Sequence, residues 1–391
     1  MDPFTTPERR ALAELSRNFA SDNLAAALPE WEDSGEIPLT VIRALADTGL
    51  LGAGYPEDLG GSGGDIIDVS VITENLISGG ASGGFIAGAF SHGIAVPHIV
   101  DAIRARESSG DADSAAWLAD WAVRPVLAGQ TLAALAVTEP DGGSDVAHLR
   151  TRAVRDGDDW VINGSKTFIT SGTRAGVVVV AARTGEPGAG GVSLFAVDTN
   201  NAGFVVTRKL AKMGWHCSDT AELAFVDCRV PDAALLTPLP GGGFASLSRH
   251  FAVERLSLAT IAHSTAARAL DLTVEWVKNR ETFGRPLISR QTVRHTLVEM
   301  HRQTDVARSY TKSVACAKAS GSPVLLEAVM AKNTAVSACE FVVDQAVQLH
   351  GGAGYMRSSE VERHYRDARV LGIGGGATEV MTDLAAKLLG W

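Results

Sequence analysis

Glu254 is an acidic residue in a helical segment whose pattern suits general-base chemistry. On a helical wheel it shares one face with four apolar side chains, Leu247, Phe251, Leu258 and Ile261. A carboxylate on an apolar face loses hydration, which raises its pKa toward the range useful for removing a proton. The alternative is an ordinary helix glutamate that pairs with a neighbouring arginine.

A glycine-rich turn, Thr138–Ser144, ends a strand-like run and could bind a cofactor. Successive backbone N–H groups in such a turn can donate to carbonyl or phosphate oxygens. The same residues also suit a tight β-turn with a serine cap. From the turn alone, both interpretations stay open.

A second glycine cluster, Gly372–Ala377, matches the dinucleotide fingerprint G-x-G-x-x-A, but its surroundings do not fit. The fingerprint requires a buried strand before it and an acidic residue about 20 positions later. The charged run Arg363–Asp367 precedes it, and only 14 residues follow Ala377. We therefore exclude a nicotinamide-binding Rossmann fold.

The composition is that of a globular protein of two or three domains, with 391 residues, 46% of them apolar and 20% charged. The net charge of −10 and the lack of a basic stripe argue against nucleic-acid binding. The longest apolar stretch, Gly83–Val100, contains His92, Pro97 and His98. We therefore expect a buried helix there and no membrane span.

The four cysteines, Cys217, Cys228, Cys316 and Cys339, form no Cys-x-x-Cys pair. This pattern argues against a zinc site or a disulfide framework, so we expect no metal and a reducing compartment. The first residues, Met1–Phe4, lack the basic start and apolar run of a signal peptide. The cytoplasm is therefore the default location, although a processed organelle protein would look the same.

Three zones of different periodicity must position these residues. Residues 1–130 show helical spacing with a glycine-rich break at Tyr55–Asp65, and residues 241–391 show longer helices. Residues 131–240 hold short β-branched runs separated by turns, which predicts an antiparallel sheet or barrel. The expected strands are Leu132–Val137, Trp160–Ile162, Val177–Ala181, Val192–Val197, Phe204–Val206 and Ala221–Val226. The expected later helices are Phe244–Lys278, Gln291–Ala319, Pro323–His350 and Thr378–Leu389.

Five segments, read together, resemble the acyl-CoA dehydrogenase family in their order and spacing. They are Thr138–Asp145, Asn163–Gly172, Lys212–Pro231, Arg280–Pro286 and Gln348–Arg369. The match covers the chain from about residue 35 to 391. It implies an α+β fold with an N-terminal α-helical domain (1–130), a middle antiparallel β-barrel or sandwich (131–240) and a C-terminal four-helix bundle (241–391).

The resemblance implies FAD as the cofactor. Phe168 stands where the family often has tryptophan, and its ring keeps an apolar face but lacks the indole N–H. The implied cofactor-binding residues are Leu135, Val137, Thr138, Ser144, Phe168, Ile169, Thr170, Arg280, Phe283, Gln291, Gln348, Gly352, Thr378 and Glu379.

Some of these residues would reach the FAD of a neighbouring subunit, namely Arg280, Phe283, Gln348 and Gly352. The resemblance therefore implies a homo-oligomer, usually a homotetramer. An arginine fork suits a pyrophosphate, although an arginine at a helix terminus also commonly caps carbonyl groups.

Many members of the family carry the catalytic base in a Tyr-Glu-Gly-Thr loop near the C-terminus. In this chain the loop reads Ile373–Glu379, and Gly375 stands at the glutamate position. The isovaleryl-CoA and long-chain branches place the base on the helix after the barrel, where this chain has Glu254. The rival is Glu379, which falls in the first turn of the last helix, where an acidic residue suits the macrodipole without any catalytic role.

The implied reaction is α,β-dehydrogenation of an acyl-CoA thioester to the trans-2-enoyl-CoA, as in β-oxidation of fatty acids. Glu254 would remove the α-proton, the β-hydrogen would leave as hydride to flavin N5, and an electron-transfer flavoprotein would accept the electrons. Ser144, Arg255 and Gly375 would contact the substrate, although Arg255 could equally pair on the helix surface. The missing side chain at Gly375 suggests room for branched or bulky acyl groups.

Three alternatives remain at this point. The first is an acyl-CoA oxidase that reduces O2, and the second is a non-catalytic subunit or scaffold of the same fold. The third is a related flavoenzyme that acts on a substrate without CoA.

Overall fold

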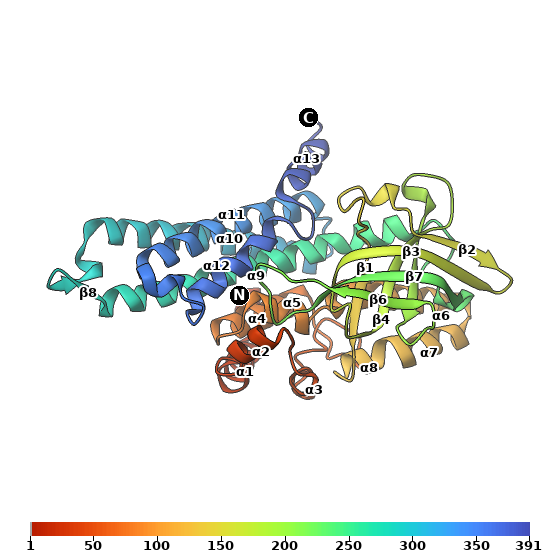
Figure 1. The fold of residues 1–391 in the computed structure, drawn as a ribbon, viewed down its shortest axis with the longest axis horizontal. Coiled ribbons are helices and arrows are strands. Elements are labelled where there is room, and N and C mark those ends of the chain that lie inside the picture. The colour runs from red at the N-terminus through yellow and green to blue at the C-terminus, as the bar shows by residue number, and fades with distance from the viewer. Residues whose placement is uncertain (1) are drawn as a thin grey trace.

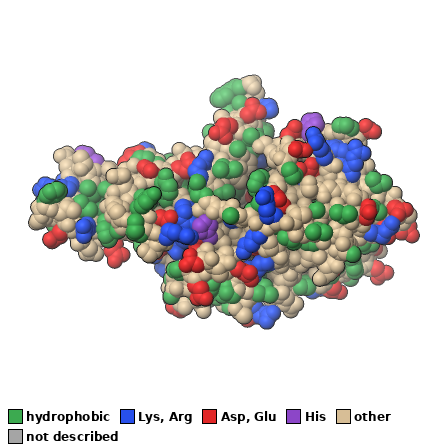
Figure 2. Space-filling view, in the orientation of Figure 1, with side chains coloured by type: hydrophobic (Ala, Val, Ile, Leu, Met, Phe, Trp, Pro, Cys, Tyr) green, Lys and Arg blue, Asp and Glu red, His purple; other side chains and the backbone are tan. Residues whose placement is uncertain are grey.

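The computed structural model describes residues 2–391 as helices, then a sheet, then helices (Figure 1). The expected α+β order is confirmed. Basic and acidic side chains are interspersed on the face shown in Figure 2. The domain boundaries at residues 130 and 240 remain our own division of the chain.

The first zone is helical throughout, with the glycine-rich break between α3 and α4. Asp65 caps α4 by accepting from the N–H groups of Ile67 and Asp68, which fixes where that helix begins. The helices are α1 (Pro7–Asn23), α2 (Leu28–Ser34), α3 (Leu39–Asp47), α4 (Ile66–Ser78), α5 (Gly83–Ala89), α6 (His92–Ser109), α7 (Ala112–Leu118) and α8 (Arg124–Leu127).

The apolar stretch of this zone is part of the protein core. By length and composition, Gly83–Ser109 could cross a membrane, and 61% of its most apolar window is buried inside the protein. The structure divides the stretch into α5 and α6, whereas we expected one helix. Buried core helices of globular proteins commonly have this composition.

A seven-stranded sheet forms the middle zone, with the order β1-β4-β2-β3-β7-β6 and with β5 paired to β4. All six expected strands are present, and the sequence pattern does not predict β2, because its charged residues hide the alternation. The strands are β1 (Leu132–Ala136), β2 (Arg152–Asp156), β3 (Asp159–Thr170), β4 (Ala175–Arg183), β5 (Val192–Asp198), β6 (Phe204–Lys209) and β7 (Thr220–Pro231).

The sheet is mixed, and this corrects the expectation of a purely antiparallel one. β1 runs parallel to β4, with Leu135 opposite Val179, whereas β3, β5, β6 and β7 pair antiparallel to their neighbours. A parallel pair needs a long crossover, and the β2–β3 hairpin supplies it between β1 and β4.

Three long helices, α9, α10 and α11, pack side by side in the last zone, with α12 and α13 against α11 (Figure 1). The sequence pattern does not predict α12, because the buried face of this helix includes the polar residues His364 and Asp367. The bounds are α9 (Gly243–Asn279), α10 (Gln291–Ala319), α11 (Leu325–His350), α12 (Glu360–Ala368) and α13 (Thr378–Leu388), with the hairpin β8 (Glu281–Thr282) and β9 (Arg285–Pro286) between α9 and α10.

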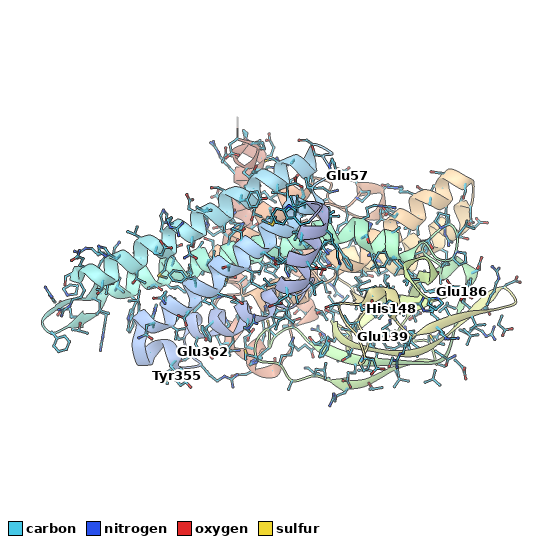
Figure 3. The ribbon with its side chains drawn as sticks, turned by 90° about the horizontal axis from the view of Figure 1, so that it is seen from above. Glu57, Glu139, His148, Glu186, Tyr355 and Glu362 are labelled. Carbon is cyan, nitrogen blue, oxygen red and sulfur yellow. The ribbon has the colours of Figure 1, made fainter. Side chains whose placement is uncertain are left out.

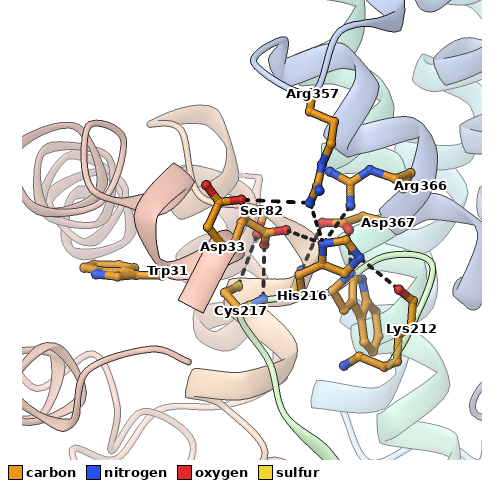
Figure 4. A network of polar contacts seen from close by, with 12 residues as sticks. Trp31, Asp33, Ser82, Lys212, His216, Cys217, Arg357, Arg366 and Asp367 are labelled. Carbon is orange, nitrogen blue, oxygen red and sulfur yellow. Dashed lines mark hydrogen bonds and ion pairs between the residues drawn. The ribbon is translucent and has the colours of Figure 1, made fainter. Parts of the chain in front are cut away.

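A buried carboxylate joins all three zones (Figure 4). Asp367 on α12 accepts a hydrogen bond from the Trp215 N–H at 2.6 Å and another from the Gly84 N–H at 3.4 Å. Burial raises the pKa of Asp367, and the nearby Glu32 carboxylate raises it further. Asp367 therefore holds the loop after β6 and the start of α5 against the helical bundle.

We expect Asp367→Ala to lower the free energy of unfolding by about 2–4 kcal/mol, because two buried N–H groups lose their acceptor. Asp383→Ala is the matched control, since Asp383 pairs with Lys387 in an exposed ion pair and should change stability by less than about 1 kcal/mol. Thermal denaturation measures both variants. Equally small changes in denaturation temperature for the two variants would contradict the role given to Asp367.

Candidate active site

A buried ion pair holds the glycine-rich turn that follows β1. Lys166 donates to Glu139 Oε1 at 2.8 Å and to the Val137 carbonyl oxygen at 2.9 Å. Glu139 also accepts from the N–H groups of Arg150, at 2.6 Å, and Thr151, at 2.9 Å. Burial lowers the pKa of Lys166 to about 8, against the opposing attraction of Glu139. The pair fixes the start of the turn to β3.

The turn itself is open to solvent. Glu139 and Gly142 exchange backbone hydrogen bonds of 3.0 and 3.1 Å, so the predicted tight turn is present. Ser144 beyond it is exposed. Thr138 is tied to β3, because its hydroxyl donates to the Thr167 carbonyl oxygen. The side chains of Val137 and Ile169 are buried in the core, and Leu135 is half-buried. Val137 and Ile169 can therefore offer only backbone groups to a ligand.

Phe168 points away from the sheet because β3 is irregular there. The pairing of β3 with β7 shifts register between Lys166 and Ile169, and Phe168 takes a positive φ of 61°. The residue is 69% exposed, which is unusual for an aromatic residue in a strand beside the core. A strained residue with an exposed apolar ring is typical of a ligand-facing position.

Glu254 lies on α9 with the apolar neighbours that the helical wheel predicts, and Leu247 and Ile261 are buried. Burial raises the pKa of Glu254, while the charges of Arg255 and Lys332 partly oppose that rise. The residue is half-buried, so its carboxylate remains accessible. It has the properties of a general base.

The loop between α12 and α13 reaches Glu254. A Cβ atom at Gly375 would lie 3.4 Å from Glu254 Oε1 and would overlap Leu258 Cδ1. Gly375 also has a positive φ of 62°. The Glu254 carboxylate therefore lies next to Gly375, the loop position at which many family members carry their glutamate. The extra room that we expected at Gly375 is not found next to its Cα, because Leu258 fills that space.

Arg255 is buried, which corrects the alternative of a helix-surface ion pair. Only 7% of the residue is exposed, and the guanidinium lies 5.6 Å from the ring centre of Phe251. No carboxylate oxygen among residues 2–391 lies within 4.0 Å of it, and its Nε has no hydrogen-bond partner there. A buried guanidinium whose Nε lacks a hydrogen-bond partner is a candidate for ligand binding.

Lys332 was missed by the sequence analysis. Its side chain is fully buried on α11, and its ammonium group donates to the carbonyl oxygens of Gly374, at 2.8 Å, and Gly376, at 2.5 Å. The only sequence signal is a single lysine in an apolar stretch of that helix. Glu379, by contrast, is exposed in the first turn of α13, which favours a structural role, and Thr378 is half-buried.

The remaining predicted cofactor-binding residues lie at the opposite end of the molecule from the sheet (Figure 1). Phe283, at the tip of the β8–β9 hairpin, is 97% exposed with a positive φ of 53°. Figure 3 likewise shows Glu139 at the sheet and Tyr355, which ends the turn after α11, in the helical zone. One chain does not bring these residues together with Thr138, Ser144 and Phe168. The exposed members of this distant group are Arg280, Phe283, Gln291, Gln348 and Gly352.

Comparisons with known proteins give one consistent result. Family profiles described as acyl-CoA dehydrogenase N-terminal, middle and C-terminal domains match residues 6–102, 134–228 and 241–390. The chain belongs to the acyl-CoA dehydrogenase family. It is an oxidoreductase that acts on acyl-CoA, in fatty-acid metabolism, and its cofactor is FAD.

Three relatives illustrate the match. A putative acyl-CoA dehydrogenase structure from Mycobacterium smegmatis is 56% identical, with a TM-score of 0.94 and 99% of each chain covered. A structure from work on the electron-transferring flavoprotein of Acidaminococcus fermentans is 30% identical, with a TM-score of 0.91, 100% of this chain and 99% of that chain covered. The pig mitochondrial long-chain specific acyl-CoA dehydrogenase is 35% identical over 384 residues, 97% of this chain and 86% of the relative.

The residues around the sheet fit a flavin cofactor. The exposed Phe168 ring offers an apolar face, and the Thr138–Ser144 turn offers backbone N–H groups. Among residues 2–391, no group of three His, Cys, Asp or Glu side chains could hold a metal ion.

We expect Lys166→Met to weaken FAD retention and to destabilise the protein by about 3–5 kcal/mol, because it leaves the Glu139 carboxylate buried without its cation. Arg208→Met is the control, since Arg208 pairs with Glu222 at the surface and its loss should cost under about 1 kcal/mol. The flavin-to-protein absorbance ratio and thermal denaturation measure the two effects. Full FAD content in Lys166→Met would show that the ion pair does not hold the turn.

Proposed function

We propose that this chain converts an acyl-CoA thioester to the trans-2-enoyl-CoA with Glu254 as the base. One observation carries the proposal: the Glu254 carboxylate lies 3.4 Å from the Cβ position of Gly375. The glutamate that many family members carry in this loop is absent here, and a helix carboxylate occupies its place. The pig relative is described as a long-chain enzyme, a branch that places its base on this helix.

The electrostatics suit removal of an α-proton. Glu254 must be ionised to act, and its raised pKa makes it a stronger base than an exposed carboxylate. When bound, FAD would supply the acceptor for the hydride that leaves the β-carbon. Arg255 lies next to Glu254, and its Nε has no hydrogen-bond partner among residues 2–391, so we assign it to an anionic or carbonyl group of the substrate.

A homo-oligomer follows from the two separated groups of predicted cofactor residues. Thr138, Ser144 and Phe168 lie at the sheet, whereas Arg280 and Phe283 lie at the far end of the bundle (Figure 1). A second copy that supplies the distant group would complete each flavin site. An isolated chain would leave Phe283 in solvent, at an unfavourable positive φ. We infer a homotetramer because that is the usual state of the family.

We propose an electron-transfer flavoprotein as the electron acceptor. The similarity to the Acidaminococcus fermentans structure supports this assignment. The oxidase alternative predicts rapid O2 consumption by the substrate-reduced enzyme. The scaffold alternative predicts no flavin reduction by any acyl-CoA, and the half-buried, accessible Glu254 argues against it.

We expect Glu254→Gln to lower the rate of flavin reduction by an acyl-CoA by about 10²–10⁴-fold, because the amide cannot take the α-proton. FAD content should not change. Glu379→Gln is the matched control and should reduce the flavin at the normal rate, since Glu379 is exposed. Anaerobic stopped-flow absorbance with a panel of straight and branched acyl-CoAs measures all three proteins. A Glu254→Gln enzyme with normal rates would refute the assignment.

The rate of flavin reduction should rise with pH as Glu254 ionises, with a midpoint above the ordinary glutamate value of 4.5. Arg255→Gln should move that midpoint to higher pH, because the positive charge that favours ionised Glu254 is lost. Stopped-flow rates between pH 5 and about pH 9, a range that spans the shifts known for buried carboxyls, give the two profiles. A midpoint that moves down in Arg255→Gln would contradict the electrostatic account.

A further inference from the structure

Lys332 is a buried lysine whose hydrogen bonds have no role in the proposed reaction as described so far. Burying an ammonium group is costly, and an apolar side chain could fill the same space between helices at lower cost. Its two hydrogen bonds go to one loop, to the carbonyl oxygens of Gly374 and Gly376. The lysine therefore has a role tied to that loop.

The loop needs an external tether. Gly374, Gly375 and Gly376 have no side chains to pack, and φ is 62° at Gly375 and 97° at Gly376. Glycine loses more conformational freedom on ordering than any other residue, so three in succession do not hold one shape by themselves. The Lys332 ammonium, anchored in α11, holds the carbonyl groups on both sides of Gly375.

These contacts also set the direction of one amide. In a planar trans peptide, the C=O and N–H bonds point to opposite sides. Because the Gly374 oxygen points to Lys332, the N–H of Gly375 points away from it. That N–H makes no hydrogen bond to any acceptor among residues 2–391. An unsatisfied donor therefore lies beside Glu254.

We propose that Lys332 is a positioning residue that aims the Gly375 N–H at the thioester oxygen of the substrate. The inference rests on the proposed function. When Glu254 takes the α-proton, the electron pair of the broken C–H bond delocalises onto the thioester oxygen. A preorganised N–H at that oxygen would stabilise the charge, and FAD, when bound, would supply the acceptor for the β-hydrogen as hydride.

The test measures how well the site stabilises negative charge on a thioester, without turnover. Acetoacetyl-CoA binds as a thioester whose ionisation is visible as enolate absorbance. The holoenzyme carries Glu254→Gln, so that the base does not contribute to the titration. Adding Lys332→Met should raise the pKa of the bound acetoacetyl-CoA by about 1–2 units, a ten- to hundred-fold loss, which is below the cost of removing an oxyanion donor outright.

Lys212→Met is the matched control, because Lys212 is a partly buried lysine that donates to Thr220 Oγ1 at 2.9 Å and to the Ser218 carbonyl oxygen. It should leave the pKa of the bound ligand unchanged. Lys332→Leu also removes the donor, and it replaces the methionine variant if that variant does not fold with FAD.

A bound-ligand pKa in Lys332→Met or Lys332→Leu that matches the parent would overturn the role of Lys332. The proposed function fails separately, if the wild-type holoenzyme is reduced by no acyl-CoA and does not ionise acetoacetyl-CoA.

Discussion

A desolvated carboxylate has to stay ionisable, and the centre of this protein is arranged around that requirement. The apolar face of α9 raises the pKa of Glu254, and two cations from different elements oppose the rise. Arg255 comes from the same helix, whereas Lys332 comes from α11. Burial alone would keep Glu254 protonated, so that it could not accept a proton. A stronger positive charge nearby would lower the pKa of Glu254 and make its carboxylate a weaker base. The net result is a pKa of Glu254 above its ordinary value, which makes the ionised carboxylate a stronger base than an exposed one.

The helical part of the site could be predicted from the sequence because helical periodicity is a local property. Three features follow from residues that are close in the chain: Glu254 on an apolar helix face, the start and end of α10, and the tight turn at Glu139–Gly142. The contact between Glu254 and Gly375 joins residues far apart in the chain. The sequence suggested it only through a resemblance, because periodicity carries no information about which loop meets which helix.

The features that were missed share one physical cause. Lys332 on α11 and Asp367 on α12 are charged-type side chains that tertiary packing buries. The charged segment β2 becomes a strand by pairing with β3 and β4. A lysine in a helix is normally a surface residue, so its pattern gives no sign that it binds loop carbonyls. Leu258 shows the converse: the missing side chain at Gly375 suggested an opening, yet packing from α9 fills it.

Removal of the α-proton by Glu254 is the central claim, and hydrogen exchange isolates it from hydride transfer. An acyl-CoA without a β-hydrogen, such as 3,3-dimethylbutyryl-CoA, cannot be dehydrogenated but still carries α-protons. Mass spectrometry after incubation in D2O would measure deuterium uptake at the α-carbon. Our account predicts uptake with the wild-type holoenzyme and little above the uncatalysed rate with Glu254→Gln. Equal uptake with both proteins would show that another group removes the proton.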